Sequence, residues 1–281
     1  MENATRLTAS PEAFNGAQGV SWTQDNRILY AAEDIRGGSH VYRLEQQGGH
    51  PQHFTSGNSD MEPSSCPGGS ALFASEDPEH SGLWTLDAAG RGLRQLTRGA
   101  YEWYPRVHVT GSGCSTTRFL RLHGFLRGSP GRAARRSRCS RISRGSPLAS
   151  ACAYSPDGKW VACRYIAAVD GPTQLAVIPS AGGAASKLFD MPASPISYWM
   201  RNAAYPNPPV RWALDGEALT YVVTKAGVSN IWAQALKGGP PQQLTHLKEL
   251  QIFYFDWSPQ GDLVLSRGNV SSDTVLIRNL R

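Results

Sequence analysis

Several signals that define common protein classes are missing from this sequence. No run of 18 apolar residues occurs, which excludes a predicted transmembrane helix. The N-terminus has no basic region followed by an apolar stretch, so we predict no signal peptide. The compartment stays open: extracytoplasmic if the chain is part of a membrane receptor, and cytoplasmic otherwise.

The cysteines give no recognisable framework. They stand at positions 66, 114, 139, 152 and 163, an odd number with no CxxC spacing. We therefore predict neither a set of structural disulfides nor a zinc site. His50 and His53 are three residues apart but have no third ligand near them in the sequence, so no metal site is expected there either.

Catalytic motifs are also missing. The sequence has no GxSxG nucleophile elbow, no GxxxxGK[ST] phosphate loop, no HExxH and no kinase-type HRD or DFG. We predict that the chain is not an enzyme and uses no cofactor.

The positive charge of the chain comes from one segment. The formal net charge is +6, but residues 108–150 hold nine arginines, no lysine and no acidic residue. The rest of the chain has 19 Lys and Arg against 22 Asp and Glu. The basic charge is therefore local, and we do not expect a nucleic-acid partner. An Arg-rich nucleic-acid binder remains an alternative, whose affinity would fall steeply with salt.

What the sequence does contain is a repeated hairpin. Residues 155–160 read SPDGKW, in which Pro presets φ, Asp can bond back to its own backbone and Gly accepts a positive φ. Weaker copies align with it, and their lead positions are 22, 65, 107, 154, 212 and 257. The aspartates of these copies, Asp25, Asp157 and Asp215, are explained by turn formation rather than by catalysis.

Each repeat continues with a polar turn, a third strand, a Gly turn and a fourth strand. Four short antiparallel strands in a repeat of this length are typical of one propeller blade. We therefore predict an all-β fold, a six-bladed β-propeller of four-stranded antiparallel blades that spans residues 1–281 as one domain. The predicted blades are approximately 19–57, 58–99, 101–147, 151–190, 207–247 and 251–281, the last one closed by residues 5–8 pairing beside 274–277.

The third blade is degraded. The repeat pattern disappears within 108–150, where Arg, Ser and Gly dominate. One interpretation is a disordered basic insert. The other is a pair of compensating frame slips, because back-translating residues 108–117 and dropping two bases gives RDRQWVLYD, which resembles SPDGKWVAC. The genomic DNA would decide between them.

One mouth of the ring is the candidate binding site. Segments that lead into first strands are rich in aromatic residues and arginine, which favour recognition surfaces. The candidate binding residues are Tyr101, Trp103, Tyr104, Arg106, Tyr198, Trp199, Arg201, Phe253 and Tyr254. The alternative is that these aromatics only fill space at blade junctions.

The repeats resemble those of the TolB family of β-propellers. Its signature of SPDG, an apolar strand, a Trp-containing strand, a GG turn and QLT is found in YSPDGKW, LWTLDAAGRGLRQLT and IWAQALKGGPPQQLT. The C-terminal string FDWSPQGDLVLSRGNVSSDTVLIRNL is similar to the end of bacterial propellers fused to receptor-type serine/threonine kinases or winged-helix regulators. The resemblance fails over 108–150.

The resemblance implies a non-catalytic module for protein binding or ligand sensing. We expect a monomeric fragment detached from a bacterial signalling protein, with a protein or small ligand bound at one mouth of the propeller. An alternative is the gating propeller of a prolyl-oligopeptidase-type serine peptidase, which would need a separate hydrolase domain.

Overall fold

Short antiparallel strands make up the fold. The computed structural model describes residues 5–8, 19–34, 36–66, 69–97, 106–110, 113–117, 120–122, 125–127, 148–166, 172–180, 184–192 and 209–269. Within these ranges all the regular elements are strands, and no α-helix is present. The prediction of an all-β fold is confirmed.

Four sheets have four strands each, in the order of the chain. The first is β1 (Val20–Trp22), β2 (Arg27–Glu33), β3 (Ser39–Glu45) and β4 (Gln52–His53). The second is β5 (Asp60–Ser65), β6 (Ala71–Ser75), β7 (Gly82–Leu86) and β8 (Arg94–Gln95). The next is β13 (Leu148–Tyr154), β14 (Trp160–Ile166), β15 (Thr173–Pro179) and β16 (Lys187–Asp190). The last is β17 (Arg211–Trp212), β18 (Ala218–Lys225), β19 (Val228–Ala235) and β20 (Gln242–Gln243).

Three further sheets have two strands each. They are β9 (Arg106–Thr110) with β10 (Gly113–Thr117), β11 (Leu120–Leu122) with β12 (Phe125–Arg127), and β21 (Gln251–Trp257) with β22 (Leu263–Gly268).

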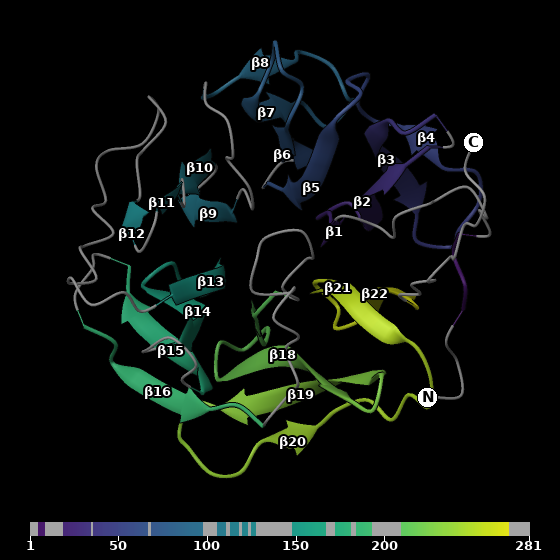
Figure 1. Ribbon diagram of the computed structural model, residues 1–281. Coiled ribbons are helices and arrows are strands. Elements are labelled where there is room, and N and C mark those ends of the chain that lie inside the picture. The colour runs from purple at the N-terminus through teal and green to yellow at the C-terminus, as the bar shows by residue number, and fades with distance from the viewer. Residues whose placement is uncertain are drawn as a thin grey trace, which may run out of the picture.

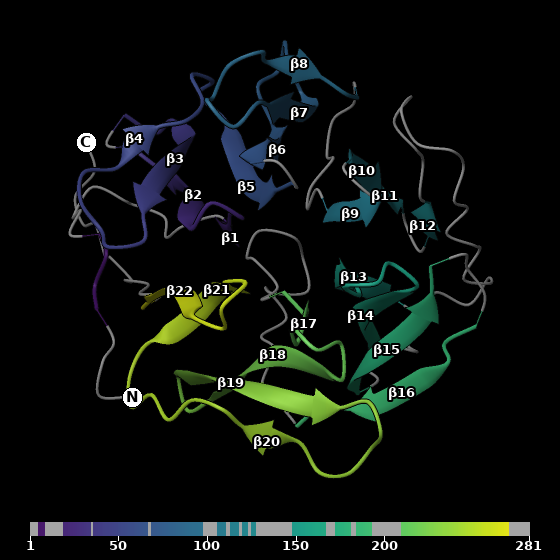
Figure 2. The same cartoon turned by 180° about the vertical axis from the view of Figure 1, so that it is seen from behind.

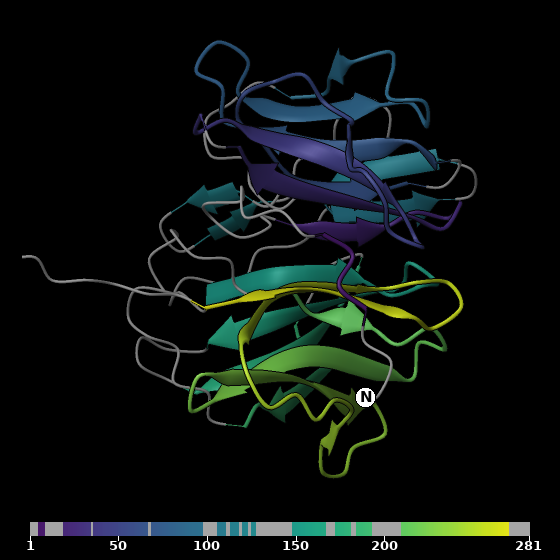
Figure 3. The ribbon, with the colours of Figure 1, turned by 90° about the vertical axis from the view of Figure 1, so that its right-hand side faces the viewer.

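The sheets surround a common centre, as the blades of a propeller do. In each four-stranded sheet the first strand lies nearest the centre and the fourth lies at the rim (Figure 1). Figure 2 shows the same arrangement from behind, and Figure 3 shows the sheets from the side. Contacts lead from β1 to β5, from β5 to β9, from β9 to β13, from β13 to β17, from β19 to β21 and from β21 back to β1. The first and last sheets therefore adjoin, and the ring is closed.

The prediction of six four-stranded blades is confirmed only in part, because the described residues form four. In the third repeat β9–β10 and β11–β12 are separate hairpins, since a segment without apolar alternation gives a sheet no face to bury. In the last repeat β21 and β22 pair with each other alone. The expected third strand at 274–277 lies outside the described residues, and residues 5–8 form no strand.

The SPDG hairpin owes its shape to local hydrogen bonds. The Ser155 hydroxyl donates to Asp157 Oδ1 (2.6 Å) and accepts from the Trp160 N–H (3.0 Å), while Asp157 also accepts from the Lys159 N–H (3.1 Å). Gly158 has φ 71°, a conformation that glycine adopts without strain. Hairpins with the same backbone hydrogen bonds recur at 23–27, 66–70, 213–218 and 258–262. Turn formation therefore accounts for the repeated aspartates, as predicted.

The threonine that ends the QLT motif also has a structural role. In three blades its hydroxyl accepts a hydrogen bond from a backbone N–H of the third strand. The pairs are Thr55 with Val41 (3.1 Å), Thr97 with Leu83 (2.9 Å) and Thr245 with Ile231 (2.8 Å). Beyond the two-residue fourth strand, the threonine hydroxyl thus accepts the hydrogen bond of a third-strand N–H, which explains why the motif recurs.

The core lies between neighbouring sheets rather than in one centre. Ala162 and Leu175 of the β13–β16 blade pack against Leu219 and Tyr221 of the β17–β20 blade. Other clusters join the first two blades, the first blade to β21–β22, and the β17–β20 blade to β21–β22. Blades in these pairs therefore bury their apolar faces against each other.

The expectation that the cysteines form no disulfide is wrong. Cys152 on β13 and Cys163 on β14 are joined, with Cα atoms 4.1 Å apart. The register of the two strands shifts between Ser150 and Ala153, and this bulge brings Cys152 opposite Cys163. Cys66 is disulfide-bonded as well. Sequence spacing could not show this, because the pairing depends on the strand register.

Removing the Cys152–Cys163 disulfide is expected to lower the free energy of unfolding by about 2–4 kcal/mol, because the unfolded chain gains conformational freedom. The double substitution Cys152→Ala and Cys163→Ala tests this by urea denaturation. A non-reducing peptide map should show the two cysteine peptides linked in the wild type. Equal stability of the two proteins would contradict the expectation.

Leu7 links the start of the chain to the junction of the first and last sheets. It packs against a buried cluster that includes Trp22 of β1 and Tyr254 of β21. Leu7→Ala is therefore expected to lower the free energy of unfolding by about 1–2 kcal/mol. Arg6→Ala, at an exposed position beside it, should change stability by less than about 0.5 kcal/mol. Equal effects in thermal or urea unfolding would show that Leu7 makes no contribution of its own.

Candidate functional site

The blades end on two different faces. We call the face with the hairpins between first and second strands the turn face; it includes residues 23–26 and 155–158. We call the opposite face the loop face; it holds the turns between second and third strands and the connections between blades, such as 34–38 and 246–250. The first strands of the blades begin on the loop face, so the predicted binding mouth corresponds to that face.

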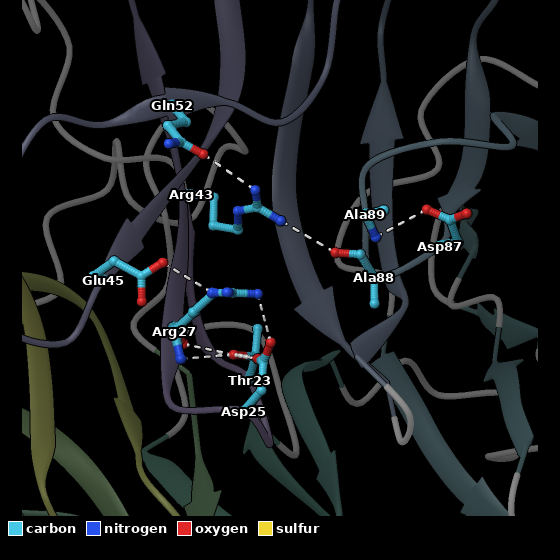
Figure 4. Close-up of polar contacts among 9 residues, drawn as sticks. All are labelled: Thr23, Asp25, Arg27, Arg43, Glu45, Gln52, Asp87, Ala88 and Ala89. Carbon is cyan, nitrogen blue, oxygen red and sulfur yellow. Dashed lines mark hydrogen bonds and ion pairs between the residues drawn. The ribbon is translucent and has the colours of Figure 1, made fainter.

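On the turn face, charged side chains pair with one another. Arg27 Nε donates to Glu45 Oε1 (2.9 Å), and its Nη1 donates to Asp25 Oδ2 (2.8 Å). Arg43 donates to the carbonyl of Ala88 in the neighbouring blade (3.1 Å) and to the Gln52 side chain (3.1 Å), as Figure 4 shows. The Arg43 contact with Ala88 links the first two blades, and the Arg27 contacts lie within the first blade.

Near the centre, one ion pair joins three inner strands. Arg211 of β17 donates through Nε to Asp256 Oδ1 of β21 (2.9 Å), and the N–H of Trp22 in β1 donates to Asp256 Oδ2 (2.9 Å). The two charged side chains are 14% and 19% exposed. Both carboxylate oxygens are used within the fold, which makes this pair a structural link rather than a site for a ligand.

Most of the predicted binding residues lie outside the described part of the chain. Tyr101, Trp103, Tyr104, Tyr198, Trp199 and Arg201 fall there, and Arg106 is the first residue of β9. Phe253 is half-buried on β21, and Tyr254 is only 4% exposed. Both pack on the cluster between the first blade and β21–β22. The ring of Tyr254 is therefore part of the core, as the space-filling alternative predicted for blade junctions.

Sequence reasoning missed a polar cluster between the first two blades. His40, at the loop-face end of β3, is 8% exposed; its Nε2 lies 3.6 Å from Asp34 Oδ2, and its Nδ1 is buried without a hydrogen-bond partner. Asp60, the first residue of β5, is 3% exposed. Burial raises the pKa of the Asp60 carboxyl, against the lowering effect of hydrogen bonds from Thr55 and Ser75.

Asp60 is expected to make the protein less stable as the pH rises. Because its pKa is higher in the folded than in the unfolded chain, the folded state binds the proton more tightly. Stability is therefore highest below the unfolded pKa near 3.8 and falls as the pH rises through the folded value, by at most about 1.4 kcal/mol per pH unit.

The variant Asp60→Asn isolates this effect. The difference in free energy of unfolding, wild type minus variant, should decrease as the pH rises from the unfolded pKa of 3.8 through the raised folded pKa. Urea unfolding at several pH values measures it. A difference that stays constant, or that grows with pH, would contradict the assignment.

A second missed group lies between the β13–β16 and β17–β20 blades. Arg164 of β14 and Tyr221 of β18 face each other across the interface, and both are buried. Arg164 Nε and the Tyr221 hydroxyl have no hydrogen-bond partner. The available signal was an arginine in the otherwise apolar strand sequence VACRY, where two aligned repeats have Ala32 and Val222.

Among the described residues, no group of three or more His, Cys, Asp and Glu side chains is placed to hold a metal ion. The described ranges also contain no helix of the length and hydropathy needed to cross a bilayer.

Comparison with known proteins supports the fold. No family model and no curated sequence matches the chain. A structure described as a TolB protein from Agrobacterium tumefaciens is similar with a TM-score of 0.66 and 18% identity, over 93% of this chain and 92% of that one. TolB from Acinetobacter baumannii gives a TM-score of 0.58 and 16% identity, over 83% of this chain and 55% of that one.

An enzyme is also among the similar structures. Oligogalacturonate lyase from Vibrio parahaemolyticus matches with a TM-score of 0.51 and 11% identity, over 92% of this chain and 89% of that one. At these identities the likeness establishes the propeller fold alone.

Proposed function

We propose that this chain, which has the fold of TolB-type β-propellers, is a non-catalytic module that binds a protein or small ligand on its loop face. The observation that carries the proposal is the distribution of buried polar atoms without a partner. Two belong to the first hairpin on the turn face, Trp22 Nε1 and Asn26 Oδ1. The other four belong to His40, Arg164, Tyr221 and Arg267.

Three of these four residues lie at loop-face ends of strands, and Tyr221 lies beside one of them. Buried polar groups are normally hydrogen-bonded, so such atoms mark positions where the fold itself supplies no partner. Arg27 on the turn face is paired with Asp25 and Glu45, and on the loop face His80 is paired with Asp77. The buried atoms without a partner at the loop-face ends of strands therefore support that face as the binding face, and the predicted aromatic segments precede strands in the sequence.

We propose that the ring has six blade positions and serves as the scaffold of the binding module. We propose that β9–β12 occupy the third position as a damaged blade and that β21–β22 are the inner half of the sixth. The disulfide-bonded Cys66 and the Cys152–Cys163 pair favour an oxidising compartment. Membership of a larger signalling protein and a monomeric state stay predictions.

Site-specific photocrosslinking in the source cell tests the binding face. A photoreactive amino acid in place of Tyr198 or Tyr101 should form cross-links to one common partner. The same amino acid in place of Glu45, on the turn face, should not. Cross-links from Glu45 alone, or none from the loop-face positions, would overturn the proposal.

The non-catalytic part has a separate test, because one similar structure is a lyase. Incubation with oligogalacturonate and manganese should give no increase in ultraviolet absorbance from an unsaturated product. A steady increase in absorbance would show that the chain is an enzyme and would contradict the non-catalytic proposal.

A further inference from the structure

The guanidinium of Arg164 is a buried cation without a carboxylate. Arg164 is 5% exposed, and its Nη2 donates to the carbonyl of Val222 at 2.9 Å. Its Nε has no partner, and no acidic side chain in the described part of the chain forms an ion pair with it. Burial lowers the pKa of Arg164 to about 10, so the side chain stays positively charged at neutral pH.

Tyr221 adds a second donor to the same place. It is fully buried on β18 and packs in the cluster that joins the two blades. Its hydroxyl is buried and has no partner. Burial raises the pKa of Tyr221 to about 12, so at neutral pH the phenol keeps its proton and can donate it. Arg164 Nε and the Tyr221 hydroxyl therefore both lack a hydrogen-bond acceptor within the fold, although Arg164 Nη2 has one.

The rest of this interface shows the usual pairing. Trp212 Nε1 donates to the carbonyl of Ala153 (3.0 Å), and Lys187 Nζ donates to the carbonyl of Leu236 (2.7 Å). Arg211, whose side chain is 14% exposed, is paired with Asp256. Removing a charge from water without a counter-charge is unfavourable. The Arg164 site therefore differs from its surroundings in lacking an anion of its own.

We propose that Arg164 and Tyr221 form a binding site for a carboxylate group between the β13–β16 and β17–β20 blades. The proposal rests on the proposed function, because it names the chemistry that the loop face recognises. The single positive charge of Arg164 matches a monoanion, and a carboxylate accepts hydrogen bonds from a guanidinium and a phenol together. The carboxylate belongs either to a small organic acid or to the C-terminus of a peptide.

The probe for the test is sodium acetate, followed by saturation-transfer NMR and thermal unfolding at constant ionic strength in a carboxylate-free buffer. Acetate should bind the wild type and raise its melting temperature. Arg164→Gln should weaken acetate binding at least tenfold, and Tyr221→Phe, which removes only the hydroxyl, should weaken it severalfold. Arg91→Gln, whose side chain is 81% exposed, should bind as the wild type does.

Stability without acetate gives a second measurement. Because Arg164 has no internal counter-charge, Arg164→Gln should melt at the same temperature as the wild type or higher. A lower melting temperature would show that the fold already compensates the charge and would count against the proposal. If Arg164→Gln does not fold, the acetate affinity of Tyr221→Phe still tests the proposal.

Three results would overturn the proposal. The wild type could fail to bind acetate, both Arg164→Gln and Tyr221→Phe could bind acetate as tightly as the wild type does, or the wild type could bind chloride as tightly as acetate. Comparing a short peptide with its C-terminal amide separates the two sources of the carboxylate. Loss of binding with the amide assigns the site to peptide C-termini, and acetate binding without peptide binding assigns it to small acids. The assay needs no partner protein, so its failure is distinguishable from failure of the crosslinking test.

Discussion

Replacing Asp256 by alanine is expected to lower the free energy of unfolding by about 3–5 kcal/mol. The substitution leaves the Arg211 guanidinium, 14% exposed, without its counter-charge. It also removes the acceptor of the Trp22 N–H. Because these contacts join β17, β21 and β1, the loss weakens the centre of the ring. Urea unfolding followed by tryptophan fluorescence measures it.

A matched control is present on the turn face. Arg27 and Glu45 also form an Nε-to-carboxylate contact of 2.9 Å, but these side chains are 35% and 60% exposed. Glu45→Ala should therefore change stability by less than about 1 kcal/mol, because water screens an exposed pair. The double substitution Arg211→Met and Asp256→Leu should recover part of the loss, since no unpaired charge remains. Equal losses from Asp256→Ala and Glu45→Ala would contradict the role given to burial.

Replacing Gly82 by alanine is expected to lower the free energy of unfolding by about 3 kcal/mol or more. Gly82 is the first residue of β7 and has φ 136°, where a side chain is strained. A Cβ at this position would overlap the backbone carbonyl oxygen of Thr97. That part of the chain also holds the hydrogen bond from the Leu83 N–H to the Thr97 hydroxyl, so the third and fourth strands of the blade would have to separate.

Gly92→Ala separates the overlap from the backbone strain. Gly92 also has a positive φ, of 67°, but no atom lies within 4 Å of a Cβ built there. This substitution should lower stability by only about 1 kcal/mol. Thermal unfolding of the two variants compares them directly. If Gly82→Ala loses no more than Gly92→Ala, the close approach of Thr97 has no energetic consequence.

The hairpins and strands could be predicted because their hydrogen bonds are local. Ser155, Asp157 and Trp160 are within five residues of one another, and their order in the chain is sufficient to form the turn. The third repeat could not be predicted in the same way, because its Arg-rich segment has neither apolar alternation nor turn residues at the expected spacing.

The sequence led to a predicted binding face, which stays a prediction. In a propeller all first strands begin on the same face, so the topology alone predicts that face, independently of the side chains. The residues now assigned to it were not found from the sequence, because Arg164 and Val222 are 58 residues apart and meet only through blade packing. Tyr254 was included among the candidate binding residues, since three consecutive aromatic residues at 253–255 do not show which of them is buried.

The amino-acid sequence by itself determined the repeat, the turns and the class of fold, because each depends on contacts between residues close in the chain. Only the tertiary structure decided which buried charges have partners. Asp256 meets Arg211, and Cys152 meets Cys163, because strand register and the packing of blades bring them together. Arg164 meets Tyr221 and, among the described residues, no carboxylate for the same reason, and the carboxylate-binding proposal depends on that arrangement.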